Sequence, residues 1–139
     1  MMPPDSDLEK VYRETDYIVD DDPPLRLNVG EQNDGMRILM VSMGVESAAF
    51  VTAWNPGSQR LPMDENLDRQ ADLLEAIEKL RLNYFVGRGE HPGEGWSEDS
   101  YLILGISPEE ALALAGQFGQ NAFLWIPISG VPELRWTGE

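Results

Sequence analysis

Three clusters of polar side chains in this 139-residue sequence have the types and spacing to bind a ligand or to carry acid–base chemistry. The first begins in the stretch WNPGSQR and continues into the helix predicted after it. The second is a glycine-rich stretch with two carboxylates and the single histidine, and the third is a Gln-Asn pair before the last apolar run. The candidate binding residues in these clusters are Asn55, Ser58, Gln59, Asn66, Arg69, Gln70, Arg88, Trp96 and Asn121.

The first cluster has two interpretations, which differ in what its amides bind. At about 100° per residue, Asn66 and Gln70 fall on the same apolar stripe of the predicted helix as Leu67. Arg69 lies at the border of this stripe. A buried amide without a partner costs about 1–3 kcal/mol, so these amides need hydrogen bonds. They either anchor the backbone of the irregular loop 55–60, the commoner use of such amides, or line a polar pocket in which Arg69 and free helical N–H groups face an anion or a carbonyl.

The second cluster contains the candidate catalytic residues, Glu90, His91 and Glu98. Glu90 and Glu98 could act as a carboxylate pair, and His91, with an unperturbed pKa of about 6.5, as a base. Arg69 or Arg88 would then hold an anionic substrate, which makes a hydrolase-like enzyme one alternative. The other interpretation of this stretch is a solvated loop that a tryptophan pins over the sheet edge, with no mutual geometry fixed for catalysis.

The third cluster is the pair Gln120-Asn121. As local structure, the pair forms a turn from a helix that ends at Gly119 into the last predicted strand. Because Asn121 begins that strand, it could also lie close to the end of an element from the other half of the domain.

The composition excludes several classes of chemistry. The sequence has no cysteine, which excludes disulfides, thiolate nucleophiles and cysteine-based metal sites, and any Ser-His-Asp triad would depend on His91. We therefore expect no metal and no cofactor. The net charge is −15, from 25 acidic and 10 basic side chains, and a field of this sign repels nucleic-acid backbones.

The acidic charge also allows a hypothesis in which the protein mimics nucleic acid and binds a basic protein. Asp64, Asp68, Asp72 and Glu75 repeat at about one-turn spacing along one side of the predicted helix. In most helices such a face is simply solvated, which is the competing interpretation.

Length and hydropathy predict one cytoplasmic domain. At 139 residues, with 42% hydrophobic and 25% charged residues, the chain is long enough to bury a single core. No apolar run approaches the roughly 18 residues needed to span a bilayer, and the N-terminus lacks the basic-then-apolar form of a signal peptide. We expect a mobile tail over residues 1–7 and one domain over residues 8–139, with its core at 48–128.

The elements that must position these clusters follow from periodicity and punctuation. Pro62 suits the first turn of a long helix, and Ser107 begins a capping box that starts another. Residues 36–43 have helical spacing, with Asp34 as the N-cap and Gly44 after the end, although their Ile and Val content would also suit a strand. The predicted helices cover residues 7–15, 36–43, 62–82 and 108–118, and the predicted strands cover residues 16–20, 24–29, 48–54, 83–87, 100–106, 121–128 and 132–136.

From residue 48 to residue 128 the order of elements is β-α-β-β-α-β. Two crossovers of this kind place both helices on one face of an antiparallel sheet, so we predict an α+β fold of the ferredoxin-like split β-α-β-β-α-β type. The N-terminal strand pair and short helix would be additions to this sandwich. An exposed edge at 25–29 or at 132–136 could pair with a second copy of the chain to give a homodimer, or be covered by the N-terminal segment.

The same stretches resemble a bacterial family of uncharacterised proteins, domain of unknown function 3293. The matching words are TAWNPGSQ with Asn66 and Arg69 downstream, GEGWSEDSYLILG, and FGQNAFLW, which together span about Phe50 to Trp125. The resemblance implies that the three polar clusters belong to one recurring pattern. It implies no activity, substrate or partner.

We therefore expect a small accessory or binding domain without catalysis. Its ligand would be a polar small molecule or a protein segment, held by the loop from Trp54 to Arg60 and by the N-terminus of the following helix. The hydrolase-like enzyme and the acidic mimic of nucleic acid remain the alternatives.

Overall fold

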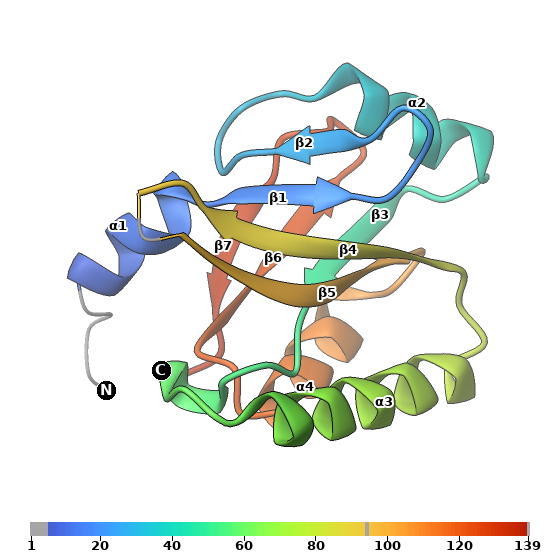
Figure 1. Ribbon diagram of the computed structural model, residues 1–139. Helices are drawn as coiled ribbons and strands as arrows, with labels where there is room; N and C mark the ends of the chain where they lie inside the picture. The colour runs from blue at the N-terminus through green and yellow to red at the C-terminus, as the bar shows by residue number, and fades with distance from the viewer. Residues whose placement is uncertain (1–5, 94, 139) are drawn as a thin grey trace.

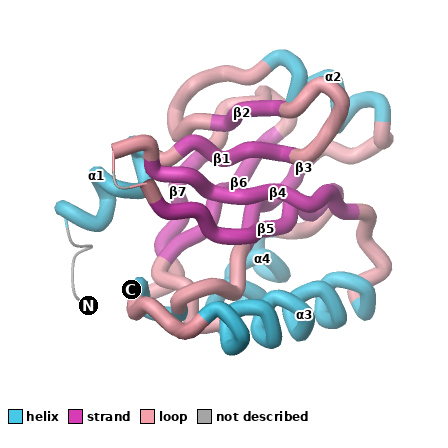
Figure 2. Tube along the Cα trace, viewed as in Figure 1, coloured by secondary structure: helices cyan, strands magenta, loops and turns pink. Residues whose placement is uncertain are grey.

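The computed structural model describes residues 6–93 and 95–138 of the chain. One sheet has helices on both of its faces and at one end (Figure 1), and Figure 2 shows the same arrangement by secondary structure. The helices are α1 (Ser6–Glu14), α2 (Asp34–Ser42), α3 (Met63–Lys79) and α4 (Pro108–Gln117), with a 3-10 turn, η1, at Pro56–Ser58. The strands are β1 (Asp16–Val19), β2 (Leu25–Leu27), β3 (Ser47–Val51), β4 (Tyr84–His91), β5 (Trp96–Leu104), β6 (Ala122–Pro127) and β7 (Glu133–Trp136).

The seven strands pair antiparallel in the order β2-β1-β4-β5-β3-β6-β7. Helix α3 connects β3 to β4, and β5 lies between those two strands. Helix α4 connects β5 to β6, and β3 lies between them. Both helices cover the same face of the sheet, which is the lower face in Figure 1. The predicted α+β class, with an antiparallel sheet, is confirmed.

The sheet buries apolar side chains on both faces. On one face, Leu73 of α3 and Leu114 of α4 pack in the same core as Val51 of β3. On the other face, Met40 of α2 packs in a second core with Phe50 of β3. Phe50 and Val51 are neighbours in one strand and point to opposite faces. Because both faces are covered, the central strands contain nearly continuous apolar runs instead of an alternating pattern.

The sheet curls so that its two edge strands approach each other around the second core. Gly30 N, after β2, donates a hydrogen bond to Pro132 O, before β7, at 2.9 Å. Asn33 N donates to Gly130 O at 3.0 Å. Gly130 has a φ of +82°, and a Cβ there would lie 2.7 Å from Asn33 O, so this approach requires glycine. Strands β2 and β7 form the two edges of the sheet, as predicted, and pairing with a second copy remains a prediction.

The N-terminal elements follow the sequence closely. The predicted short helix corresponds to α1, and the predicted strand pair corresponds to β1 and β2. The predicted mobile tail, residues 1–7, lies mostly outside the described residues, and α1 begins at Ser6. None of the helices in the described ranges is long and apolar enough to cross a membrane.

Helix termini follow local signals. Ser107 and Glu110 form the predicted capping box of α4. The segment whose composition suited either a helix or a strand forms helix α2, as its spacing predicts. Its N-cap is Asn33 rather than the predicted Asp34, because Asn33 Oδ1 accepts a hydrogen bond from Met36 N at 2.9 Å.

The structure contradicts the predicted glycine-rich loop at residues 88–99. These residues continue β4 and β5, which stay paired as far as His91 and Trp96 and leave only a short turn. The glycines and the proline of this stretch gave it a loop-like composition, although most of it is paired as a hairpin. Gly87, at the end of the predicted strand, marks a close approach, because a Cβ there would lie 2.5 Å from Ile18 O.

Two further predictions, on the buried face of α3 and on the end of β3, are wrong in part. Leu67, expected on the apolar stripe of α3, is 49% exposed, because the buried face runs through Asn66, Gln70 and Leu73. The strand predicted over residues 48–54 ends at Val51, and the chain then enters the irregular loop. The predicted amides are therefore on the buried side of α3, although one of the predicted apolar residues is not.

Candidate functional site

The loop between β3 and α3, residues 52–62, is held in place by amide side chains of the helix. Asn66 Oδ1 accepts a hydrogen bond from Asn55 N at 2.9 Å, and Asn66 Nδ2 donates to Asn55 Oδ1 at 2.9 Å. Gln70 Oε1 accepts from Ala53 N at 3.1 Å. Asn66 and Gln70 are only 2% and 6% exposed. Both side chains therefore anchor the loop, which is the first of the two interpretations drawn from the sequence.

Arg69 clamps the same loop to the end of α4. Its Nε donates to Ala53 O at 2.8 Å, and its Nη2 donates to Phe118 O. Its guanidinium carbon also lies 6.0 Å from the centre of the Phe118 ring. Close by, Gly57 N donates to Gly119 O at 2.7 Å. Arg69 is therefore used for structure, and it does not line the cleft described below.

The loop has a backbone conformation that is rare for its residue types. Asn55 and Ser58 have φ values of 46° and 61°. They are two of the three residues other than glycine with a positive φ in the described ranges. Asparagine tolerates this region better than most residues, and such conformations persist where the surrounding structure holds them. They concentrate at functional sites, which directs attention to the surface that this loop faces.

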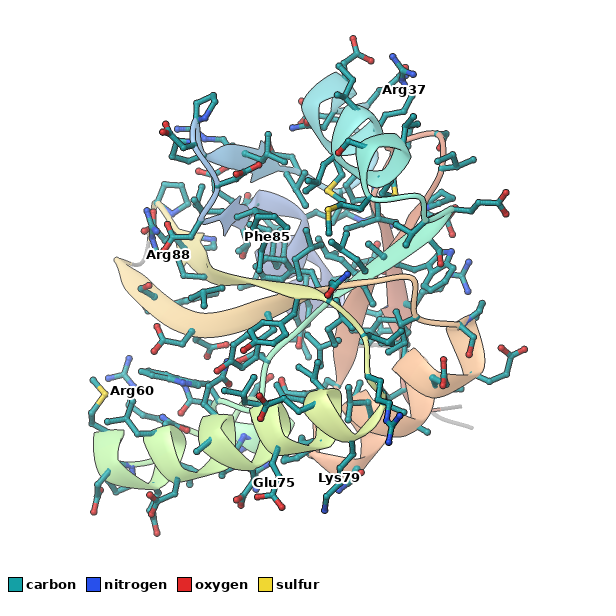
Figure 3. The ribbon with its side chains drawn as sticks, turned by 90° about the vertical axis from the view of Figure 1, so that its right-hand side faces the viewer. Arg37, Arg60, Glu75, Lys79, Phe85 and Arg88 are labelled. Carbon is teal, nitrogen blue, oxygen red and sulfur yellow. The ribbon has the colours of Figure 1, made fainter. Side chains whose placement is uncertain are left out.

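A cleft of about 300 Å³ lies between α1, this loop and β5. Figure 1 shows α1 and the loop at the same end of the sheet, and Figure 3 shows Arg60 beside the start of α3. Helix α1 supplies an apolar wall, and the loop and β5 supply most of the polar groups. The lining residues are Leu8, Val11, Tyr12, Asn55, Ser58, Arg60, Trp96, Glu98 and Gln120.

Glu98 is the acidic side chain of the cleft. Its Oε2 accepts a hydrogen bond from Asn55 Nδ2 at 2.8 Å. Burial raises the pKa of Glu98 above its ordinary value of 4.5, and the bond from Asn55 opposes this rise only in part. Within the described ranges, no Lys, Arg or His side chain forms an ion pair with this carboxylate. The cleft thus contains a partly buried acid without a cationic partner.

Tyr12 closes the cleft from the side of α1. Burial raises the pKa of its phenol to about 12, and a hydrogen bond with the Ser58 side chain opposes the rise. Ser58 Oγ in turn accepts from Asn121 Nδ2 at 2.9 Å. The Tyr12 ring also meets Trp136 of β7 edge-on, with centroids 5.6 Å apart. These contacts join α1 to the loop and to the edge strand, and Asn121 supports the cleft without lining it.

Trp96 lines the cleft and is backed by His91. The two rings stack at an interplanar angle of 29°, with centroids 5.8 Å apart. His91 is 7% exposed, and its Nε2 lies 3.2 Å from Glu14 Oε1 at the end of α1. His91 therefore supports the Trp96 ring and the position of α1, and it is not one of the residues that line the cleft.

Glu90 and Arg88 lie outside the cleft. In the hairpin register Glu98 pairs with Gly89, and neighbouring residues of a strand point to opposite faces. Glu90 therefore points to the face opposite Glu98, where it forms an ion pair with Arg88. The predicted carboxylate pair is not formed, and Arg88 is on the wrong face to hold a substrate at Glu98. Gln59 is exposed and does not line the cleft either.

A larger groove, of about 570 Å³, runs between α3 and α4. Its apolar part includes Leu80, Leu114 and Phe118. Among its charged residues, Lys79 and Glu75 form an ion pair at 3.3 Å, and Figure 3 shows both side chains pointing away from the sheet. These two charges are exposed to water and already paired, so they would gain little from binding a ligand. The groove is therefore a weaker candidate site than the cleft that contains Glu98.

The wall that α1 contributes is the part of the site that the sequence prediction missed. Leu8, Val11 and Tyr12 stand at i, i+3 and i+4, a helical stripe that indicates which side of α1 packs. The stripe does not indicate what α1 packs against, because that depends on the curl of the sheet.

In the part of the chain that the structure describes, no three His, Asp or Glu side chains are grouped so that they could hold a metal ion.

Comparison with known proteins locates a family but no function. The family described as "Protein of unknown function (DUF3293)" matches residues 51–123, more than half of the 139-residue chain. The matched range contains the loop, α3, the β4–β5 hairpin and α4, and therefore both Asn55 and Glu98, whereas α1 lies before it. No curated protein and no solved structure matches the chain.

Proposed function

The chain belongs to this family of proteins of unknown function, DUF3293, and we propose that it is a binding domain for a polar small molecule. The ligand occupies the cleft between α1, the loop at residues 52–62 and β5. The observation that carries the proposal is the carboxylate of Glu98, which is partly buried in the cleft and has no cationic partner in the described ranges. Burying a charge without a partner costs free energy, and a ligand with a positive charge would offset this cost by pairing with Glu98.

The rigidity of the cleft walls supports binding by a pre-formed site. Asn66 and Arg69 fix the loop from the side of α3, so Asn55 is held where it meets Glu98. His91 stacks behind Trp96 and limits the movement of that ring. Groups whose positions are fixed before the ligand arrives lose little conformational freedom on binding, which favours affinity.

The chemistry of the lining supports binding over catalysis. Glu98 is the one carboxylate among the lining residues, and His91 stands behind the Trp96 ring. A general acid–base mechanism needs titratable groups within hydrogen-bond reach of one reacting atom. The cleft instead combines one acid and one guanidinium with amides, hydroxyls and aromatic rings, which is the composition of a recognition site.

The fold offers a scaffold on which such a site is placed at one end of the sheet. We also infer that β4, β5, β3 and β6, with α3 and α4, form a ferredoxin-like split β-α-β-β-α-β unit, to which α1, β1, β2, α2 and β7 are added. The inference is supported by the strand order, because each of the two helices connects strands that are separated by a third. In this arrangement the added α1 covers the end of the hairpin and completes the cleft.

The experiment is a thermal-unfolding screen with amino acids, nucleotides and sugar phosphates, run on the native protein and on two variants of α1. V11W fills the cleft, whereas K10W changes an exposed neighbour that does not line it. A ligand at ten times its Kd stabilises by about 1.4 kcal/mol, which raises Tm by about 5 °C in a domain of this size. We expect such a shift in the native protein and in K10W, and none in V11W. No shift with any compound, or the same shift in V11W, would refute the proposal.

A further inference from the structure

We propose that the ligand is a zwitterion of amino-acid size with an apolar or aromatic side chain. Its ammonium group pairs with the Glu98 carboxylate, and its carboxylate pairs with the Arg60 guanidinium. This inference rests on the proposed function of the cleft and specifies the ligand's chemistry. It draws on four features of the lining residues: an unpaired acid, two aromatic rings, an unpaired cation and the volume between them.

The unpaired carboxylate of Glu98 favours a ligand with a positive charge. Glu98 Oε2 accepts its bond from Asn55 Nδ2, and no group of the described residues donates a hydrogen bond to Glu98 Oε1. No basic side chain in the described ranges pairs with Glu98 either. A primary ammonium supplies both the positive charge and the missing donors.

The aromatic rings favour the same group. Tyr12 and Trp96 both line the cleft together with Glu98. The Trp96 ring is stacked on His91, and the Tyr12 ring is held edge-on by Trp136, so both rings are fixed in place. A cation near the face of such rings is attracted by their quadrupole, and the attraction grows when the site is shielded from water.

Arg60 supplies the second charge. It lines the cleft, is exposed, and has no acidic partner in the described part of the chain. In a protein with 25 acidic side chains, an arginine without an ion pair is available for a ligand. A guanidinium binds a carboxylate with two parallel hydrogen bonds, which orients the ligand as well as holding it. Leu8 and Val11 of α1 then face the ligand's side chain.

The volume of the cleft and the net charge of the protein restrict the class of ligand further. The cleft measures about 300 Å³, at the lower end of the range for ligand pockets, which favours a molecule of amino-acid size over a nucleotide. The net charge of −15 repels phosphates and other multiply charged anions. A zwitterion carries no net charge, so its approach is not opposed by this field.

The test uses L-phenylalanine and two analogues that each lack one of its charges. 2-Phenylethylamine keeps the ammonium and lacks the carboxylate, and 3-phenylpropanoate keeps the carboxylate and lacks the ammonium. We expect the protein to bind L-phenylalanine most tightly in isothermal titration, to bind 2-phenylethylamine more weakly, and not to bind 3-phenylpropanoate. Equal affinity for 3-phenylpropanoate and L-phenylalanine would overturn the inference. If the wider screen gives a V11W-sensitive shift with a compound that has no ammonium group, the zwitterion is wrong and the binding function stands.

Two variants, E98Q and R60Q, test which residue of the protein binds each charged group of the ligand. E98Q should weaken L-phenylalanine and 2-phenylethylamine by about tenfold or more, while R60Q should weaken L-phenylalanine and leave 2-phenylethylamine unchanged. D99N is the matched control for E98Q, because it removes an exposed carboxylate from the opposite face of the same strand. Thermal melts of all three variants confirm that they fold. Unchanged affinity in a folded E98Q would overturn the inference, and so would an R60Q variant that loses both ligands equally.

Discussion

Asn55 Nδ2 donates a hydrogen bond to Glu98 Oε2 at 2.8 Å, and this bond joins the loop after β3 to β5 inside the cleft. The oxygen of the same amide accepts from Leu61 N and from Asn66 Nδ2, each at 2.9 Å. One side chain therefore fixes the shape of the loop and satisfies part of a buried carboxylate. This explains why asparagine stands at a φ of 46°: glycine would adopt the backbone conformation more easily but would supply no amide.

The first prediction concerns the charge beside Glu98. In N55D the carboxylate oxygen can still accept from Leu61 N, but the donor to Glu98 is lost and a second negative charge takes its place. We expect a loss of stability at pH 7 that becomes smaller toward pH 5, because one of two adjacent carboxylates takes up a proton more readily. Urea unfolding of N55D and of the native protein at pH 7 and at pH 5 measures this loss of stability. Q59E adds the same charge at an exposed position in the loop and should show neither effect.

The second prediction concerns the anchoring of the loop. N66A removes the acceptor of Asn55 N and the donor to Asn55 Oδ1, and leaves buried polar groups without partners. We expect a loss of about 3 kcal/mol in the free energy of unfolding. D68A, an exposed position two residues further along α3, should change it by less than about 0.5 kcal/mol. Equal effects of N66A and D68A in urea unfolding would mean that the Asn66 bonds do not hold the loop.

The third prediction separates two glycines of β4. A Cβ on Gly87 would lie 2.5 Å from Ile18 O and 2.9 Å from the Phe50 ring, and the backbone carbonyl cannot move aside. A Cβ on Gly89 would meet nothing closer than 3.6 Å. We therefore expect G87A to cost about 3 kcal/mol and G89A to be nearly neutral. Chemical denaturation of the two variants gives the comparison, and a G87A protein as stable as G89A would show that the β1–β4 contact is looser than described.

The sequence predicted most of the elements because their termini carry local signals. The capping box at Ser107 marks a helix start that depends on a few neighbouring residues only. The two strands of the β4–β5 hairpin were predicted, but their extension to His91 and Trp96 was missed. Residues 88–99 contain three glycines and a proline, a composition typical of a loop, whereas their pairing depends on contacts with β1, which is far away in the sequence. Local composition therefore misplaced the inner ends of both strands.

The site was predictable to the extent that it depends on helix periodicity. The spacing of Asn66 and Gln70 places both on the buried side of α3, and the structure finds them bonded to the loop as the first interpretation expected. The pairing of Glu98 with Asn55 depends on the antiparallel register of β3 and β5, and the closure by Tyr12 depends on its contacts with Ser58 and Trp136. No local pattern encodes these contacts, because each joins segments that are far apart in the sequence.

The last prediction is the pH dependence that Glu98 gives to the free energy of unfolding. Burial raises the pKa of Glu98 in the folded protein above its ordinary value of 4.5, so the folded state keeps this proton at pH values where the unfolded chain has released it. Stability then falls as pH rises through this interval, since it falls wherever the folded state binds more protons. E98Q has no proton to lose at this position. Relative to the native protein, E98Q should therefore gain stability as pH increases from about 4, and the difference should level off once Glu98 is ionised in both states.

Urea unfolding of the native protein, E98Q and D99N over about pH 4 to pH 8 measures this difference, because the other acidic groups titrate equally in all three and cancel. Asp99 is exposed and next to Glu98 in β5, so D99N controls for the loss of one negative charge from a protein with a net charge of −15. A difference between E98Q and the native protein that does not change with pH would contradict the burial of Glu98. A difference that runs in the opposite direction would mean that Asn55 stabilises the ionised carboxylate by more than burial penalises it.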